Sequence, residues 1–229
     1  MASEWGLELG QPFALALHSF AAPAGDGVLK VIPEEHVESG HEGDALEHWD
    51  GDGAVRLLRR EGQTLLLERA HPGTDLSELA EEEATALAVE VALRLWRPAG
   101  TPFRWVGDWL PRWLDEEPNQ LTPVARELLA SLDVGRSTLV HGDFHHHNVL
   151  ASGRGHLAID PQPFLAEPEF DVPTFLWNPL PCRLRVEHLE SRLAAFVAAG
   201  LDEERIRKWT VIRGAYLQPQ EAEALLAML

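Results

Sequence analysis

Short apolar runs separated by glycine-containing turns fill the first third of the chain, a pattern that predicts antiparallel strands. The polar segment 34–49 carries apolar residues at helical spacing, so we expect one helix among these strands. The strands should form a five-stranded sheet, and they are predicted at residues 13–17, 19–22, 28–32, 53–58 and 64–69.

The remaining two thirds of the chain shows mainly helical spacing of apolar residues. The segment His71-Pro72-Gly73 separates the two patterns, and a break of this kind between a strand-rich and a helix-rich part is typical of a hinge. The sequence therefore predicts an α+β fold with two lobes, residues 1–72 and residues 73–229. Helices of the second lobe are predicted at residues 81–97, 103–114, 122–132, 172–177, 183–199, 203–217 and 220–228.

Two polar segments between predicted strands hold residues that phosphoryl transfer needs. They are His141-Gly142-Asp143-Phe144-His145-His146-His147-Asn148 and Ile159-Asp160-Pro161-Gln162-Pro163. The spacing of Asp143 and Asn148 matches a kinase catalytic loop, with Asp160 as the second aspartate of the pattern. In that pattern one carboxylate accepts the proton of the attacking hydroxyl and two oxygen side chains bind Mg²⁺. The pattern predicts a small-molecule kinase with Asp143 as base and Asn148 and Asp160 as magnesium ligands.

The segment that joins the two motifs supports this assignment. Residues 149–151 and 156–159 are mainly apolar, and residues 152–155 are typical of a turn. A hairpin here would bring Asn148 and Asp160 to the same end of adjacent strands, where one cation could bind both.

Other interpretations of the first motif remain open. An ordinary turn before a buried strand would account for His141-Gly142-Asp143, but not for the full set that ends in Asp160. A metal-dependent hydrolase is an alternative, because histidines and carboxylates crowd the motif. Adjacent residues of an extended segment point to opposite faces, however, so three consecutive histidines do not readily converge on one ion. We expect His145, His146 and His147 to be loop and surface residues.

Lys30 stands in the middle of an apolar strand, where a buried ammonium group needs a partner. The following helix offers Glu38 and Glu42, which lie one turn apart. In kinases a strand lysine binds the α- and β-phosphates and a helix glutamate orients it. Lys30 is therefore the predicted phosphate-binding residue, with either glutamate as its partner.

Two further nucleotide contacts are predicted. Adenine should bind at the hinge through backbone groups near Glu68 to Ala70. The segment between the first strands lacks a glycine cluster, and Ser19 is the candidate there for a phosphate contact. A nucleotide-binding protein without catalytic activity is a second alternative, favoured by the missing glycine loop.

Asp171 precedes the predicted helix at 172–177, and two roles are open for it. Its carboxylate could cap that helix, and it could also brace the catalytic loop by accepting backbone N–H groups.

Composition and charge narrow the possible partners. With 229 residues and 45% apolar residues the chain can fill one sizeable domain or two small lobes. The formal net charge of −18 argues against nucleic-acid binding and favours a cationic ligand. No apolar run reaches membrane-spanning length and no targeting segment is visible, so we expect no membrane partner. The single cysteine, Cys182, fits a reducing cytoplasm.

The order of these features resembles the aminoglycoside phosphotransferase superfamily, and within it the streptomycin-6-phosphotransferase branch of aminoglycoside and hydroxyurea resistance kinases. The resemblance spans about residues 5–177 and includes the Ile159–Pro163 motif, with Gln162 where this branch frequently has lysine. It implies a protein-kinase-like bilobal fold, with an N-terminal antiparallel sheet, one helix and a mostly helical C-terminal lobe. It also implies phosphoryl transfer from ATP with Mg²⁺, and these roles: Lys30 on the phosphates, Glu42 as its ion-pair partner, Asp143 as base, and Asn148 and Asp160 on the metal.

The resemblance leaves the acceptor open. Streptomycin carries guanidinium groups, so its pocket should present carboxylates. The candidates are Asp115, Glu116, Glu117, Glu167 and Glu169. Related kinases phosphorylate other alcohols, and a metabolic kinase on the same fold is the remaining alternative.

Overall fold

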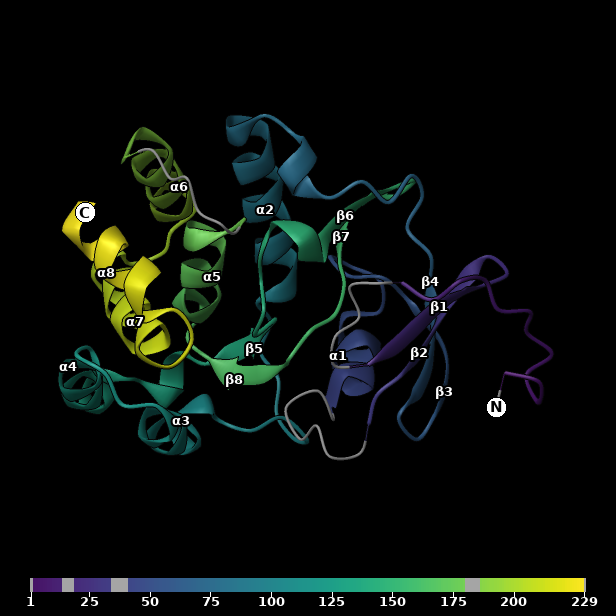
Figure 1. Ribbon diagram of the computed structural model, residues 1–229, viewed down its shortest axis with the longest axis horizontal. Coiled ribbons are helices and arrows are strands. Elements are labelled where there is room, and N and C mark those ends of the chain that lie inside the picture. Colours follow the sequence, from purple (N-terminus) through teal and green to yellow (C-terminus); the bar gives the residue numbers. More distant parts are fainter. Residues whose placement is uncertain (1, 14–18, 34–40, 180–185, 229) are drawn as a thin grey trace.

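The computed structural model describes residues 2–13, 19–33, 41–179 and 186–228 (Figure 1). Strands β1 to β4 lie at one end of the molecule, helices α3 to α8 at the other, and strands β5 to β8 between them. Among the described residues no helix is long and apolar enough to cross a membrane.

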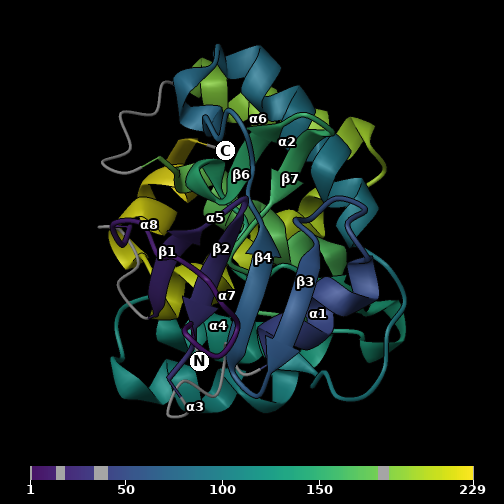
Figure 2. The same ribbon diagram turned by 90° about the vertical axis from the view of Figure 1, so that its right-hand side faces the viewer.

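The N-terminal lobe is an antiparallel sheet with one helix, α1 (Glu42–Trp49), packed beside strand β3 (Figure 2). The order is β1-β2-β4-β3, and a two-residue turn with Gly25 at φ +58° joins the first two strands. Glycine suits this turn because the left-handed region is strained for other residues. The strands are β1 (Phe20–Ala24), β2 (Gly27–Val31), β3 (Leu57–Glu61) and β4 (Thr64–Glu68).

Two strand predictions need comment. The predicted strand at 13–17 and the predicted helical residues 34–40 lie almost wholly outside the described residues. Within the described residues the N-terminal sheet has four strands instead of the predicted five. The strand predicted at 53–58 begins only at Leu57. The reason is that the backbone around Ala54 bonds instead to Ala158, with Val55 N donating to Ala158 O over 3.0 Å.

The C-terminal lobe is mostly helical and contains two short antiparallel strand pairs. In one pair β5 (Thr138–Val140) lies against β8 (Phe164–Ala166), and in the other β6 (Val149–Ser152) lies against β7 (Gly155–Ala158). The helices are α2 (Glu81–Leu95), α3 (Leu110–Glu116), α4 (Thr122–Leu128), α5 (Val172–Trp177), α6 (Val186–Ala198), α7 (Glu203–Tyr216) and α8 (Pro219–Met228).

The helix predicted at 103–114 starts late. It begins at Leu110, with Pro111 in its first turn, where the missing N–H of proline costs nothing. The other helical predictions agree with the observed helices to within a few residues where the structure describes them.

One apolar core joins the two lobes. It contains Leu46 of α1, Leu65 of β4, Leu95 of α2 and Phe175 of α5, all fully buried. The indole of Trp49 also donates a hydrogen bond to the carbonyl of Leu95 over 2.8 Å. We propose the division between the lobes at residues 72 and 73, directly after the segment that leaves β4.

A buried arginine ties three helices of the second lobe together. The guanidinium of Arg192 on α6 bonds both carboxylate oxygens of Glu81 on α2, over 2.5 and 2.9 Å. Its remaining nitrogen donates to the carbonyls of Phe175, Leu176 and Asn178 at the end of α5. Because Arg192 is only 3% exposed, removing its side chain would leave buried acceptors unpaired.

We therefore expect Arg192→Leu to lower the free energy of unfolding by about 3 to 5 kcal/mol. The matched control is Arg207→Leu on α7, whose guanidinium forms a more exposed pair with Glu203 one turn away and should change stability by less than about 1 kcal/mol. Urea unfolding of both variants checks this, and equal effects would contradict it.

Candidate active site

The two motifs identified in the sequence meet at the ends of β5, β6 and β7. The side-chain nitrogen of Asn148 donates to the backbone oxygen of Asp143 over 2.9 Å and lies 3.2 Å from its carboxylate. Ile159 N donates to the backbone oxygen of Asn148 over 2.9 Å, which brings Asp160 next to the first motif. Since the amide nitrogen of Asn148 is occupied, its side-chain oxygen is the atom left to bind a cation.

Asp160 adopts an unusual backbone conformation. Its φ of +57° lies in the left-handed region, which a non-glycine residue occupies only when its surroundings enforce it. Its carboxylate forms an ion pair with Lys30 and is about half exposed. The strained backbone thus aims this carboxylate away from the core and at the lysine of the other lobe.

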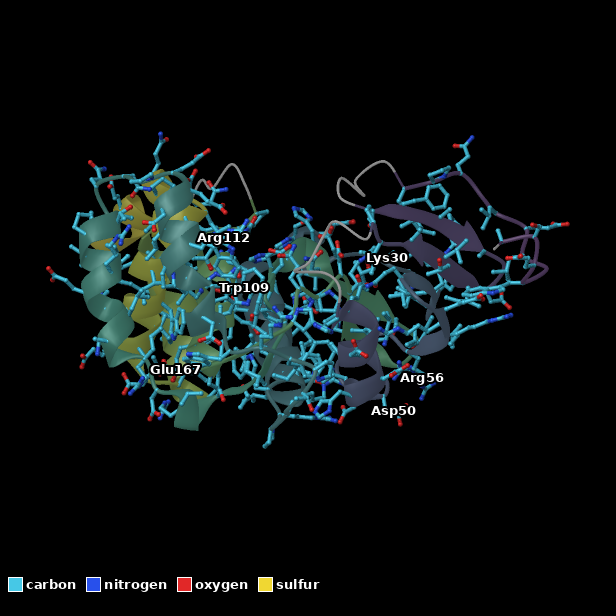
Figure 3. All side chains as sticks on the ribbon, turned by 90° about the horizontal axis from the view of Figure 1, so that it is seen from below. Lys30, Asp50, Arg56, Trp109, Arg112 and Glu167 are labelled. Atoms are coloured by element: carbon cyan, nitrogen blue, oxygen red, sulfur yellow. The ribbon has the colours of Figure 1, made fainter. Side chains whose placement is uncertain are left out.

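Lys30 is buried between two carboxylates. Its ammonium lies 2.5 Å from Glu42 Oε2 and also contacts Asp160. Burial disfavours the charge, but the two carboxylates together hold the pKa of Lys30 above its usual value. Glu42 is fully buried, and its other oxygen, Oε1, has no hydrogen-bond partner. Figure 3 shows Lys30 on the part of the N-terminal lobe that faces the rest of the molecule.

Of the two glutamates considered for Lys30, the structure pairs it with Glu42, while Glu38 lies outside the described residues. Ser19 is half-buried just before β1. The carboxylate of Glu68 bonds Arg154 over 2.6 and 2.9 Å, a side-chain pair that does not bear on the adenine contact predicted for the backbone of Glu68 to Ala70. The nucleotide contacts of Ser19, Glu68 and Ala70 stay predictions.

Asp171 braces the catalytic loop. Its two oxygens accept the backbone N–H groups of His141 and Gly142, each over 2.8 Å, and one also accepts the indole N–H of Trp96. The bracing prediction is confirmed. The capping prediction is wrong, because the side chain makes no cap hydrogen bond to α5 while its oxygens hold the loop.

The backbones of the two motifs touch at Gly142. A Cβ atom built there would lie 1.8 Å from the backbone oxygen of Gln162, and Gly142 has a φ of +85°. Gln162 N also donates to the backbone oxygen of His141 over 2.8 Å. Glycine is therefore required at this point by both space and backbone conformation.

His141 fastens the first motif to the second from inside the core. Its Nε2 donates to the carbonyl of Ile159 over 2.9 Å, and its Nδ1 accepts the N–H of Asp143 over 3.3 Å. The ring is stacked on Trp49 and fully buried, and burial lowers its pKa, so it stays neutral.

The three consecutive histidines face three different surroundings. His146 is stacked on Phe175 at 4.1 Å, His147 bonds Asp75 over 2.9 Å, and His145 Nε2 lies 3.4 Å from Asp143. Among the described residues no three His, Cys, Asp or Glu side chains are arranged to hold a metal ion. The prediction that all three are loop and surface residues is wrong for His146, which is 1% exposed.

Two of the carboxylates considered for a cationic acceptor are structural. Glu167 is buried and accepts hydrogen bonds from Trp209 and from Asp133 N, and it pairs with Arg205. Glu169, also buried, pairs with Arg136 over 3.0 Å. In Figure 3 Glu167 lies within the helical lobe, far from Lys30. The candidates that remain exposed are Asp115, Glu116 and Glu117 around the end of α3.

Sequence patterns could not reveal some residues that bond the backbone of the catalytic loop. Arg213 on α7 donates to the carbonyls of Gly142 and Phe170, over 2.7 and 3.0 Å. It lies 71 residues beyond Gly142 in the chain, and an arginine inside a helix carries no local signal of such a contact.

The fold is protein-kinase-like, and solved structures agree. Choline kinase LicA from Streptococcus pneumoniae has a TM-score of 0.64 at 13% identity, covering 99% of this chain and 86% of that one. A thermostable mutant of the aminoglycoside phosphotransferase APH(4)-Ia, in complex with ADP and hygromycin B, has a TM-score of 0.62 at 17% identity, covering 99% and 96%. At such identities the likeness confirms the predicted fold class and no more.

The chain belongs to the aminoglycoside/hydroxyurea antibiotic resistance kinase family, whose profile matches residues 17–218. A streptomycin 3''-kinase of Klebsiella pneumoniae is 36% identical over 206 residues, covering 80% of this chain and 75% of the relative. A hydroxyurea phosphotransferase of Kitasatospora aureofaciens is 34% identical, covering 97% and 72%. A streptomycin 6-kinase of Streptomyces glaucescens is 32% identical, covering 80% and 66%. The predicted family and branch are confirmed, and the protein is a kinase with a hydroxyl acceptor.

The contact at Gly142 gives one prediction. Gly142→Ala should abolish most phosphotransferase activity and lower the thermal unfolding temperature, because the new methyl group meets a backbone oxygen that no side-chain rotation can move. Gly153→Ala is the control, since nothing lies within 4 Å of its added Cβ. Full activity of Gly142→Ala would show that the two motifs do not approach as described.

Stability should depend on pH through His146. Burial, assisted by the charge of Arg192, lowers the pKa of His146 from 6.5 to about 3. The unfolded chain therefore binds this proton at a higher pH than the folded chain, and stability present above pH 6.5 is lost as pH falls towards 3.

His146→Phe keeps the stack on Phe175 and removes the titrating group. Compared with the wild type, it should lose roughly 2 kcal/mol less stability between pH 8 and pH 5. Urea unfolding at both pH values measures the difference, and parallel losses in the two proteins would contradict the assignment.

Proposed function

We propose that this protein transfers the γ-phosphoryl group of ATP, in the presence of Mg²⁺, to a hydroxyl group of a cationic aminoglycoside such as streptomycin. The observation that carries the proposal is that Lys30 pairs with Glu42 and Asp160, while the residue before Asp160 bonds the backbone of Asn148, whose amide contacts Asp143. Two of the relatives named above are streptomycin kinases, and the net charge of −18 suits a cationic acceptor.

The donor atoms of the cluster fit a magnesium nucleotide. Asn148 offers its side-chain oxygen and Asp160 a half-exposed carboxylate, and Mg²⁺ prefers a few oxygen ligands from the protein together with phosphates and water. When bound, the ion would neutralise charge on the phosphates. Lys30, held charged by its two carboxylates, is the residue proposed to bind the phosphate oxygens.

Asp143 is the proposed catalytic base. Burial opposes ionisation of this carboxyl, but the hydrogen bond from His145 and the charge of Arg213 hold its pKa below the usual value. Asp143 is therefore ionised at neutral pH and can orient the acceptor hydroxyl. As the acceptor oxygen bonds to phosphorus and the bond to the ADP oxygen breaks, the carboxylate takes the hydroxyl proton.

A second acceptor is favoured by one observation. The hydroxyurea phosphotransferase matches 97% of this chain, a larger share than either streptomycin kinase matches. Hydroxyurea is small and uncharged, so it would need no carboxylate pocket.

We further propose the cytoplasm, which supplies ATP, as the place of the reaction.

The decisive experiment incubates the purified protein with Mg·ATP and, separately, streptomycin, other aminoglycosides, hydroxyurea and choline, with product masses as the readout. We expect streptomycin to gain one phosphoryl group, and fragmentation of the product to locate it. Asp143→Asn should lower kcat by about 10²- to 10⁴-fold.

The control is Asp26→Asn, in the exposed turn between β1 and β2, which should leave kcat unchanged. Phosphorylation of hydroxyurea alone would select the second acceptor. Stabilisation by ATP without any product would indicate another acceptor or a non-catalytic role, and absence of ATP binding would refute the donor.

A further inference from the structure

We propose that His145 is a positioning residue, which holds the carboxylate of Asp143 so that one of its oxygens faces the acceptor hydroxyl. This inference rests on the proposed function, because it assumes that Asp143 is the base. His145 Nε2 lies 3.4 Å from Asp143 Oδ2 and 3.2 Å from the amide nitrogen of Asn148.

The hydrogen bonds around the ring assign its tautomer. The backbone N–H of His147 donates to His145 Nδ1 over 3.3 Å, so Nδ1 must carry a lone pair. In the neutral ring the hydrogen is then on Nε2, the atom that faces Asp143. The amide of Asn148 has two hydrogens, and both can point to Asp143, one to its backbone oxygen and the other to Oδ2.

Asp143 Oδ2 thus has two N–H groups beside it, the amide of Asn148 at 3.2 Å and the imidazole Nε2 of His145 at 3.4 Å. Two donors on one oxygen fix the rotation of the carboxylate about its last side-chain bond and leave Oδ1 for the acceptor. With only one donor the carboxylate could turn, and small misplacements of a catalytic group are costly in rate. The effect should appear in kcat, because the acceptor and nucleotide are bound mainly by other residues.

The neighbouring histidines supply a control. His147 lies two residues after His145 and is about half exposed, but its ring bonds Asp75 rather than Asp143. His146 is stacked on Phe175 in the core. A replacement at His147 therefore tests whether any change in the histidine run has the same effect.

The experiment compares His145→Ala, His145→Gln and His147→Gln, using the acceptor that the wild type phosphorylates. At saturating Mg²⁺ we expect His145→Ala to lower kcat about tenfold and to leave both KM values within about twofold. Glutamine can place an amide donor near the position of Nε2, so His145→Gln should recover most of the loss. His147→Gln should behave as the wild type.

Three outcomes would overturn the proposal: a kcat of His145→Ala within twofold of the wild type, no recovery in His145→Gln, or a loss that disappears as Mg²⁺ is raised. The last would mean that His145 acts through Asn148 and the metal. Thermal unfolding of each variant checks that the fold is retained.

A second readout does not depend on turnover. Nitrogen-15 NMR of the wild type, with the His145 signals identified by their loss in His145→Gln, should show hydrogen on Nε2 and none on Nδ1. The opposite tautomer would overturn the proposal even if the rates agreed. A wild type that phosphorylates no acceptor would instead refute the proposed function, while the tautomer would still report on the contact.

Discussion

The buried ammonium group of Lys30 is the interaction on which the arrangement of the site depends. It joins strand β2, helix α1 through Glu42 and the second motif through Asp160, so one charge links both lobes. An ammonium group in a core is tolerated only with close carboxylate partners, and the fully buried carboxylate of Glu42 in turn needs the lysine. The relative position of sheet, helix and catalytic motifs is thereby fixed by electrostatics, while the apolar core shared by the lobes supplies the bulk of the stability.

Backbone contacts supply the second constraint. Asp171 holds two consecutive amides of the catalytic loop, and the loop in turn approaches Gln162 so closely that only glycine fits at position 142. A loop held in this way presents Asp143 without further rearrangement. Preorganised groups of this kind are effective because their ordering cost is met during folding rather than at the moment of reaction.

The sequence predicted what depends on local pattern and spacing. Most helices, the hairpin between the motifs and the pairing of Lys30 with a helix carboxylate followed from it. It could not predict where distant segments meet. Glu167 has the pattern of an exposed loop carboxylate, yet Trp209 and Arg205 from α7 enclose it. The residues around Ala54, predicted as part of a sheet strand, do not join the N-terminal sheet for the same reason. They pair instead with Ala158, about a hundred residues away in the chain.

The histidine run shows how local geometry separates neighbouring side chains. Residues His146–Asn148 form a single 3₁₀ turn, in which successive side chains point about 120° apart and those three positions apart lie over each other. The turn sends His146 into the core and His147 towards Asp75. His145 precedes the turn in an extended conformation, and its Nε2 lies 3.2 Å from the side-chain nitrogen of Asn148, beside Asp143. The turn that places Asn148, the proposed magnesium ligand, therefore also brings its side chain beside that of His145 and the proposed base, Asp143.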